Sequence, residues 1–171
     1  MAGCYAGETG PVVLMDMKDH GFTMLLPPGW QQGWYSTAEG YYYSLNPTGH
    51  CFFKSDKRLY PSGEVLVMGW FPGDKLAVNL EKKPPFSKGR IISQREFEVY
   101  GQQAFEFQGQ TPGKNEKTID VIHVYFLWKG FEFLVSFRAP KGHLRRYEPY
   151  WHACIDSIEL CEPTGPYRAP K

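Results

Sequence analysis

The sequence predicts an α+β domain built on an antiparallel sheet, and three observations predict it. A pair of apolar runs flanks Lys129-Gly130 with the symmetry of a two-residue hairpin. Several other short runs alternate apolar and polar residues between glycine- and proline-containing breaks, which is typical of strands. After residue 143 the apolar residues instead recur at helical spacing.

The hairpin at Lys129-Gly130 fixes a register. Its pairs on one face are wholly apolar: Trp128 with Phe131, Phe126 with Phe133, Val124 with Val135, and Ile122 with Phe137. Its pairs on the other face are mixed: Leu127 with Glu132, Tyr125 with Leu134, His123 with Ser136, and Val121 with Arg138. The first face is therefore expected in a core, whereas the second is expected either under helices or against water.

Two strands are expected over 12–17 and 22–26, joined by a turn at Asp19-His20-Gly21. Pro27-Pro28-Gly29-Trp30 then interrupts the strand pattern, and Trp30 is expected to enter the core. A further hairpin is expected from 41–45 and 51–54, and a strand over 65–71 with both faces covered.

A short helix is expected over 75–82, capped by Asp74 and ended by two prolines. Strands are expected over 91–100 and 104–108, with a tight turn or bulge at Gly101 between them. The closing helix is expected to become regular near Tyr147, which would place Pro149 in its first turn. The domain boundaries follow: a flexible tether over 1–11, one domain over 12–161, and an extended tail over 162–171.

Composition narrows the function classes. The 171 residues suit one domain, and 19 basic against 18 acidic residues leave a net charge of +1, which argues against nucleic-acid binding. The longest apolar runs are too short to span a bilayer. No cofactor and no metal are expected, because neither the five histidines nor the four cysteines show ligand spacing. Cys51 and Cys154 are interpreted as small buried hydrophobes, while a bond between Cys51 and Cys161 stays open.

The start of the chain leaves two compartments open. Met1-Ala2-Gly3-Cys4 resembles the end of a bacterial lipoprotein signal, with Cys4 as the lipidated residue and the cell envelope as the location. The apolar and charged parts of such a signal are missing. The competing interpretation is an ordinary cytoplasmic start with a free Cys4 thiol.

Three groups of residues are candidates for function. His20 beside Asp19, and His123 opposite Ser136, have the residue types of a small hydrolase, but no nucleophile motif accompanies them. A solvated Asp19–His20 pair and a cross-strand hydrogen bond from His123 to Ser136 are the expected arrangements. The basic segment around Lys82, Lys83, Lys88 and Arg90, with Arg145 and Arg146 elsewhere, suits an acidic partner or plain solvation.

An aromatic segment is the favoured recognition surface: Trp34, Tyr35, Tyr41, Tyr42 and Tyr43. A strand would place Tyr41 and Tyr43 on one face and Tyr42 on the other. Exposed, this segment would hold a protein, a glycan or a small apolar ligand; buried, it would be sheet core. Both interpretations stay open. The residues expected to bind a partner or ligand are Trp34, Tyr35, Tyr41 and Tyr43.

The order of elements over about residues 20 to 160 resembles the PsbP-like superfamily, whose fold is shared with the Ran-GTPase release factor and with bacterial effector-adaptor chaperones. The resemblance rests on Leu26-Pro27-Pro28-Gly29-Trp30, on Gly101 followed by Ala104, and on the helix end Ile155-Asp156-Ser157-Ile158. It implies a central antiparallel sheet with helices on both faces, in an α/β/α sandwich. It also implies binding or scaffolding rather than catalysis, and no site residue is carried over from it.

The sequence therefore favours a non-enzymatic binding or accessory module, tethered to the bacterial envelope if Cys4 is lipidated. The first alternative is a cytoplasmic adaptor or chaperone, which predicts a concave apolar groove that shields a client. The second is a small hydrolase, which predicts a deep pocket with converging polar groups around His20 or His123.

Overall fold

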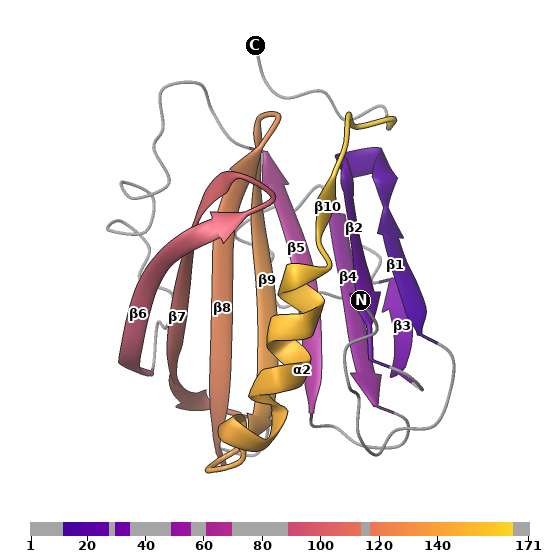
Figure 1. Cartoon of the computed structure of the whole chain (residues 1–171). Helices are drawn as coiled ribbons and strands as arrows, with labels where there is room; N and C mark the ends of the chain where they lie inside the picture. The colour runs from indigo at the N-terminus through magenta and orange to yellow at the C-terminus, as the bar shows by residue number, and fades with distance from the viewer. Residues whose placement is uncertain are drawn as a thin grey trace.

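The computed structural model in Figure 1 describes residues 12–27, 30–34, 49–55, 61–69, 89–113 and 117–165. Its strands form two antiparallel sheets. The large sheet contains, in spatial order, β3 (Trp30–Trp34), β4 (Gly49–Ser55), β5 (Ser62–Gly69), β9 (Phe131–Pro140), β8 (Thr118–Trp128), β7 (Gln102–Pro112) and β6 (Arg90–Val99). The small sheet contains β1 (Val13–Met17), β2 (Phe22–Leu26) and β10 (Glu159–Leu160).

The hairpin register predicted around Lys129-Gly130 is confirmed at every predicted pair, from Trp128 opposite Phe131 to Val121 opposite Arg138. Lys129 and Gly130 both have positive φ, 49° and 80°. That is the backbone of the tight two-residue turn whose twist matches antiparallel strands. The turn at Tyr100-Gly101 between β6 and β7 repeats it, with φ of 49° and 74°.

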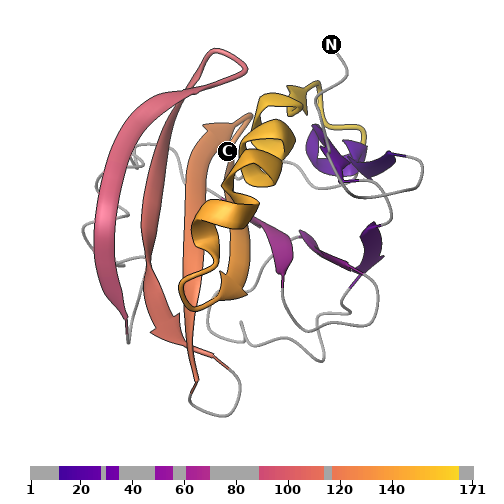
Figure 2. The same ribbon diagram turned by 60° about the horizontal axis from the view of Figure 1, so that its bottom comes forward.

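The predicted central sheet with helices on both faces is corrected in two ways. Residues 13–26 do not join the large sheet but form a sheet of their own, in which β10, which the sequence did not reveal, pairs with β2 through Leu160 opposite Phe22. Within the described ranges there is one α-helix, α2 (Leu144–Asp156). Figure 2 shows α2 and the small sheet on the same side of the curved large sheet. The predicted helix over 75–82, the strand over 41–45 and the tether over 1–11 lie outside the described residues.

The main core lies between the large sheet, the small sheet and α2. Trp151 of α2 is fully buried, stacking on Phe137 with ring centroids 4.4 Å apart and meeting Trp30 edge-on at 5.5 Å. The prediction that Trp30 enters the core is thus confirmed. From the small sheet, Phe22 stacks on Phe133 of β9 at 5.4 Å. Aromatic contacts thus tie α2 and the small sheet separately to the large sheet, within one hydrophobic core.

Helix α2 begins three residues before the predicted Tyr147, so Pro149 lies inside the helix rather than in its first turn. Proline there removes the hydrogen bond that its N–H would make to the carbonyl of Arg145. Packing overrides this local cost, because Trp151, Cys154 and Ile155 are buried on the face that meets the sheets.

A second, smaller core covers the opposite face of the large sheet. It is formed by Leu66, Phe107, Ile119, Val121, Tyr125 and Leu134, with Phe105 and Leu127 packed against it. The mixed face of the hairpin is therefore buried. The strand predicted over 65–71 is β5 (Ser62–Gly69), and the confirmed burial of its two faces places Val65 and Val67 in the main core and Leu66 in the second.

Candidate functional site

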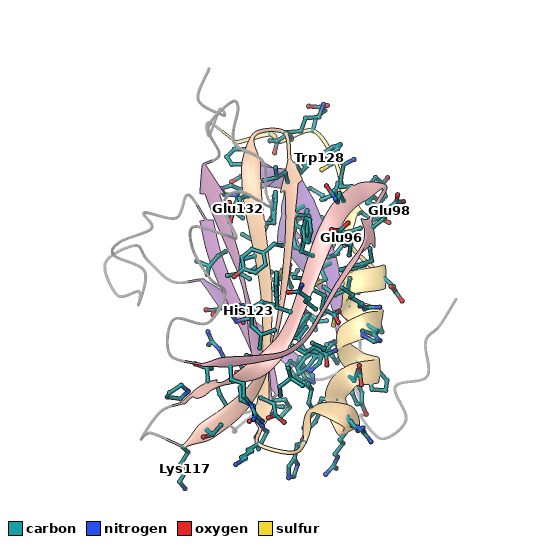
Figure 3. The ribbon with its side chains drawn as sticks, turned by 90° about the vertical axis from the view of Figure 1, so that its left-hand side faces the viewer. Glu96, Glu98, Lys117, His123, Trp128 and Glu132 are labelled. Atoms are coloured by element: carbon teal, nitrogen blue, oxygen red, sulfur yellow. The ribbon has the colours of Figure 1, made fainter. Side chains whose placement is uncertain are left out.

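A row of polar residues crosses three neighbouring strands on the second face of the large sheet. Glu64 of β5 lies opposite Ser136 of β9, and Ser136 lies opposite His123 of β8. Figure 3 shows His123 midway along the sheet, between Lys117 and Trp128. We call Glu64, Ser136 and His123 the central row. Sequence reasoning paired the last two but missed Glu64, because the pairing of β5 with β9 is long-range.

The predicted hydrogen bond between His123 and Ser136 is wrong. The Ser136 hydroxyl is fully buried and has no hydrogen-bond partner, whereas His123 Nδ1 lies 3.3 Å from the Tyr125 hydroxyl. Burial, and to a lesser extent the charge of Arg138, lower the pKa of His123 to about 4, and the charge of Glu64 opposes this shift. His123 is therefore neutral near pH 7 but does not contact the serine that it would have to activate.

Glu64 is only 4% exposed, and its charge is balanced by Arg138, whose Nη2 donates to Glu64 Oε1. A buried carboxylate requires such a partner, since an isolated charge is strongly disfavoured away from water. The carboxylate is thus held by an arginine. The central row does not have the order of a Ser-His-acid triad, in which the histidine stands between the other two groups.

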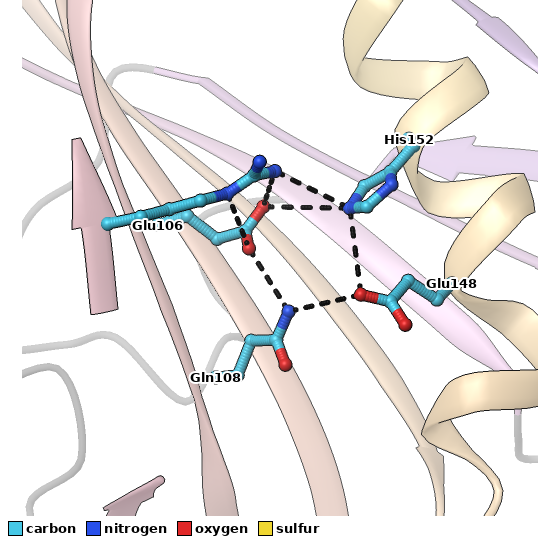
Figure 4. A network of polar contacts seen from close by, with 5 residues as sticks. Glu106, Gln108, Glu148 and His152 are labelled. Carbon is cyan, nitrogen blue, oxygen red and sulfur yellow. Dashed lines mark hydrogen bonds and ion pairs between the residues drawn. The ribbon is translucent and has the colours of Figure 1, made fainter. Parts of the chain in front are cut away.

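A second polar cluster joins the edge of the large sheet to α2 (Figure 4). Arg95 of β6 donates hydrogen bonds to both carboxylate oxygens of Glu106 of β7, from Nε to Oε1 at 3.1 Å and from Nη2 to Oε2 at 2.8 Å. Gln108 donates to Glu106 at 3.1 Å and to Glu148 of α2 at 3.4 Å. His152 Nε2 lies 3.4 Å from Arg95 Nη2. We call Arg95, Glu106, Gln108, Glu148 and His152 the edge network.

The edge network is suited to fastening α2 rather than to proton transfer. Glu106 is 3% exposed and both of its oxygens accept hydrogen bonds from neighbouring side chains. The hydrogen bond to Glu106 raises the pKa of Arg95. Sequence reasoning missed this network. Its local signals were Glu106 and Gln108 on one strand face, and Glu148 and His152 one helical turn apart.

The prediction that Asp19 and His20 form a solvated pair is wrong for His20, which is buried. His20 is 5% exposed and meets Phe131 edge-on, with centroids 5.6 Å apart. It lines a cavity of about 280 Å³ together with Asp16, Met17, Lys18 and Asp19, beside the 3-10 helix η1 (Lys18–His20). Asp16 and Lys18 at this cavity pair with each other at 3.2 Å. The hydrolase hypothesis predicted a pocket at a histidine, and this shallow surface cavity is the candidate.

The favoured recognition residues are not brought to a site that the structure describes. Trp34 ends β3, but its side chain lies outside the described residues, as do Tyr35, Tyr41, Tyr43 and Cys4. Cys154 is confirmed as buried, and burial raises the pKa of its thiol. Cys161 is a free, exposed thiol, so the bond to Cys51 left open by the sequence is not formed.

Two searches of the described residues bear on metals and membranes. They contain no group of three or more His, Cys, Asp or Glu side chains placed to hold a metal ion. Among the same residues, no helix combines the length and the apolar character that a bilayer span requires.

Comparisons with known proteins give a fold. No family model matches the chain, and no curated protein matches its sequence. Among solved structures, PsbP (CyanoP) of Synechocystis sp. PCC 6803 superposes with a TM-score of 0.64 at 11% identity, over 94% of this chain and 99% of CyanoP. LpqN of Mycobacterium tuberculosis, described as involved in cell envelope biogenesis, gives 0.53 at 12% identity, over 90% of this chain and 86% of LpqN.

PA94, a Pseudomonas aeruginosa protein of unknown function, also matches. It gives a TM-score of 0.51 at 14% identity, over 91% of this chain and 100% of PA94. These identities are too low to transfer an activity, but the matches span nearly the whole of each chain. The likeness is one of overall fold. The protein therefore has the PsbP-like fold predicted from its sequence.

Proposed function

We propose that this chain is a non-catalytic binding or accessory module. The observation that carries the proposal is the likeness to CyanoP over 94% of this chain and 99% of that one. CyanoP, PA94 and LpqN are not described by a catalysed reaction. An accessory role suits a fold whose polar clusters hold its own layers together.

The two polar clusters support this proposal. In the edge network the charges of Arg95 and Glu106 neutralise each other and fix α2 to the sheet. In the central row Ser136 lacks a base, and His123 bonds to Tyr125. Catalytic groups instead converge on a point where a substrate atom fits.

The recognition surface in this proposal is the aromatic segment, with Trp34, Tyr35, Tyr41 and Tyr43 as the contact residues. Aromatic side chains supply large contact areas at low entropic cost, which suits a protein, glycan or apolar ligand. The test uses the Trp34→Ala/Tyr41→Ala variant in quantitative in-cell crosslinking. Tyr100→Ala is the matched control, because Tyr100 is 60% exposed at the far turn of β6 and β7.

A stoichiometric partner that is retained by Tyr100→Ala and lost by the double variant, with an unchanged unfolding midpoint, supports the surface. A double variant that fails to fold assigns the segment to the core. A folded double variant that keeps every partner overturns the recognition surface.

The hydrolase alternative is tested directly with a fluorophosphonate probe that labels activated serines. We expect the wild type to be labelled no more than Ser136→Ala, since no base contacts the Ser136 hydroxyl. Labelling that maps to Ser136 and vanishes in His123→Gln would overturn the non-catalytic proposal.

The envelope location is part of the proposal, with Cys4 as the lipidated residue. Its support is the description of LpqN, which names cell envelope biogenesis. Intact mass of the amino-terminal peptide, from protein made in its native host from the complete gene, tests it. A diacylglyceryl group on Cys4 supports the envelope, whereas an unmodified Met1 removes it and favours the cytoplasmic adaptor.

A further inference from the structure

The exposed charges of the described residues are segregated between the two ends of the large sheet. At the end where β8 begins lie five exposed cations, which we call the basic end: Arg90, Lys117, Lys141, Arg145 and Arg146. Towards the opposite end, which we call the acidic end, lie Glu96, Glu98, Glu132, Glu159 and Glu162. Figure 3 shows this polarity, with Lys117 at one end and Glu96, Glu98 and Glu132 towards the other. The charges of the described residues are therefore unevenly distributed along the large sheet.

Hydrogen bonds connect the separate segments of the basic end into one surface. Arg90 of β6 donates to Gln110 of β7 at 3.3 Å, and Gln110 donates to Asp120 of β8 at 2.9 Å. The other oxygen of Asp120 accepts from the backbone N–H of Gly142 at 2.7 Å, just before α2 begins. Arg90 and Arg145, which are 55 positions apart in sequence (145 minus 90), are thus fixed at the same end of the fold.

The cations of the two ends differ in their pairing. At the acidic end Lys18 pairs with Asp16 at 3.2 Å and Lys129 pairs with Glu162 at 2.5 Å. At the basic end none of the five cations forms an ion pair within the part of the chain that the structure describes. Asp120, the carboxylate among them, is 5% exposed and has both oxygens engaged internally. The basic end therefore presents uncompensated positive charge to its surroundings.

Two exposed isoleucines adjoin these cations. Ile91 is 43% exposed and Ile92 is 57% exposed, directly after Arg90. The pairing of β6 with β7 shifts register between Ile91 and Ser93, so that Ile92 is the unpaired residue of a β-bulge. Exposed apolar side chains beside unpaired cations are the combination that binds a lipid interface, where cations meet headgroups and apolar groups enter the acyl boundary.

We propose that the basic end is a peripheral membrane-binding surface for anionic phospholipid headgroups, with Ile91 and Ile92 inserting at its edge. The acidic end then faces away from the bilayer, which gives the bound molecule one orientation. Phosphate groups accept hydrogen bonds from arginine and are drawn to lysine as a point charge. This inference is independent of the aromatic segment and of lipidation at Cys4, and it stands whether or not the module has a protein partner.

The test is co-sedimentation of the full unlipidated chain with vesicles of phosphatidylcholine, with or without phosphatidylglycerol, at rising salt. Arg145→Gln/Arg146→Gln removes two cations from the basic end. Lys18→Gln/Lys129→Gln is the matched control, since it removes two exposed cations from the acidic end. We expect binding only to the anionic vesicles and weakening with salt, lowered roughly 10-fold or more by the first variant and changed less than about twofold by the second.

Ile92→Ser separates a lipid surface from a generic polyanion surface. We expect it to weaken binding to anionic vesicles while leaving any binding to duplex DNA or polyglutamate unchanged, because neither of these has an apolar layer to enter. Equal losses in the two charge variants, binding to phosphatidylcholine alone, or no vesicle binding at low salt would each overturn the proposal. An equal response of vesicles, DNA and polyglutamate to Ile92→Ser would overturn the assignment to lipid.

Discussion

The two faces of the large sheet bury polar groups by different means. On the face beneath α2, Glu106 is held in the edge network by Arg95, Gln108 and the approaching helix. On the opposite face, Glu64 is paired by Arg138, but Ser136 has no partner and His123 is kept neutral by burial. The first face thus pairs its buried charge within a network, although the indole N–H of Trp151 is buried there without a hydrogen bond. The second face buries a hydroxyl without a hydrogen bond and a histidine whose pKa is lowered. The following four predictions probe this difference.

The largest effect is expected at Trp151, which connects α2 to β3 and β9 of the large sheet on the first face. Trp151→Ala should lower the free energy of unfolding by about 3–5 kcal/mol, because it removes the largest buried side chain and leaves a cavity. Urea denaturation followed by circular dichroism measures it. Trp151→Phe should cost much less, since it keeps the ring stack. Equal costs for the two variants would show that Trp151 does not join the layers through its volume.

The next effect concerns the edge network. Arg95→Ala should cost about 3 kcal/mol, because it leaves the buried Glu106 carboxylate with the Gln108 amide and the more distant His152 ring as its neighbours. Adding Glu106→Gln to Arg95→Ala should recover part of this loss, since the uncompensated charge is gone. A double-mutant cycle on thermal or urea unfolding tests the coupling. Additive costs would mean that the pair does not stabilise the contact between α2 and the sheet.

The pH dependence of the second face follows from His123. Its pKa of about 4 in the folded protein lies below the ordinary value of 6.5, so the unfolded chain binds the proton first as the pH falls. Stability is therefore complete above pH 6.5 and falls as the pH drops towards 4, by at most about 3 kcal/mol.

Unfolding free energies measured between those pH values should show this slope, and His123→Gln should remove most of it. An unchanged slope in His123→Gln would assign the acid sensitivity to other groups.

The smallest effect contrasts two serines. Ser136→Ala should be neutral or stabilising by up to about 1 kcal/mol, because the buried Ser136 hydroxyl makes no hydrogen bond. Ser157→Ala should destabilise by about 1 kcal/mol, because the Ser157 hydroxyl accepts from the Leu25 N–H at 2.9 Å and donates to the Cys154 carbonyl at 2.6 Å. Differential scanning calorimetry resolves the two shifts. Destabilisation by Ser136→Ala comparable to that by Ser157→Ala would show that Ser136 has a partner.

The sequence by itself determined the local antiparallel pairings. The hairpin at Lys129-Gly130 follows from side-chain alternation and turn chemistry, both of which act between near neighbours. The apolar spacing on α2 likewise predicted its buried face. The burial of Trp151 offsets the cost of Pro149, so the helix also includes the residues before that proline. The resemblance to PsbP-like proteins rested on the same local order of elements, and the solved structures confirm the fold.

Only the tertiary structure decided what depends on distant contacts. The separation of β1 and β2 into a small sheet depends on β10, a two-residue strand too short to leave a periodic signal. Glu64 lies opposite Ser136 on a neighbouring strand, and Arg95 contacts Glu106 of the next strand and His152 of α2. No local sequence pattern specifies which of these elements become neighbours. The basic end likewise unites Arg90 with Arg145 only once the strands are aligned. Side-chain alternation fixes which face a residue takes, whereas its neighbours on that face are set by the order in which the whole chain packs.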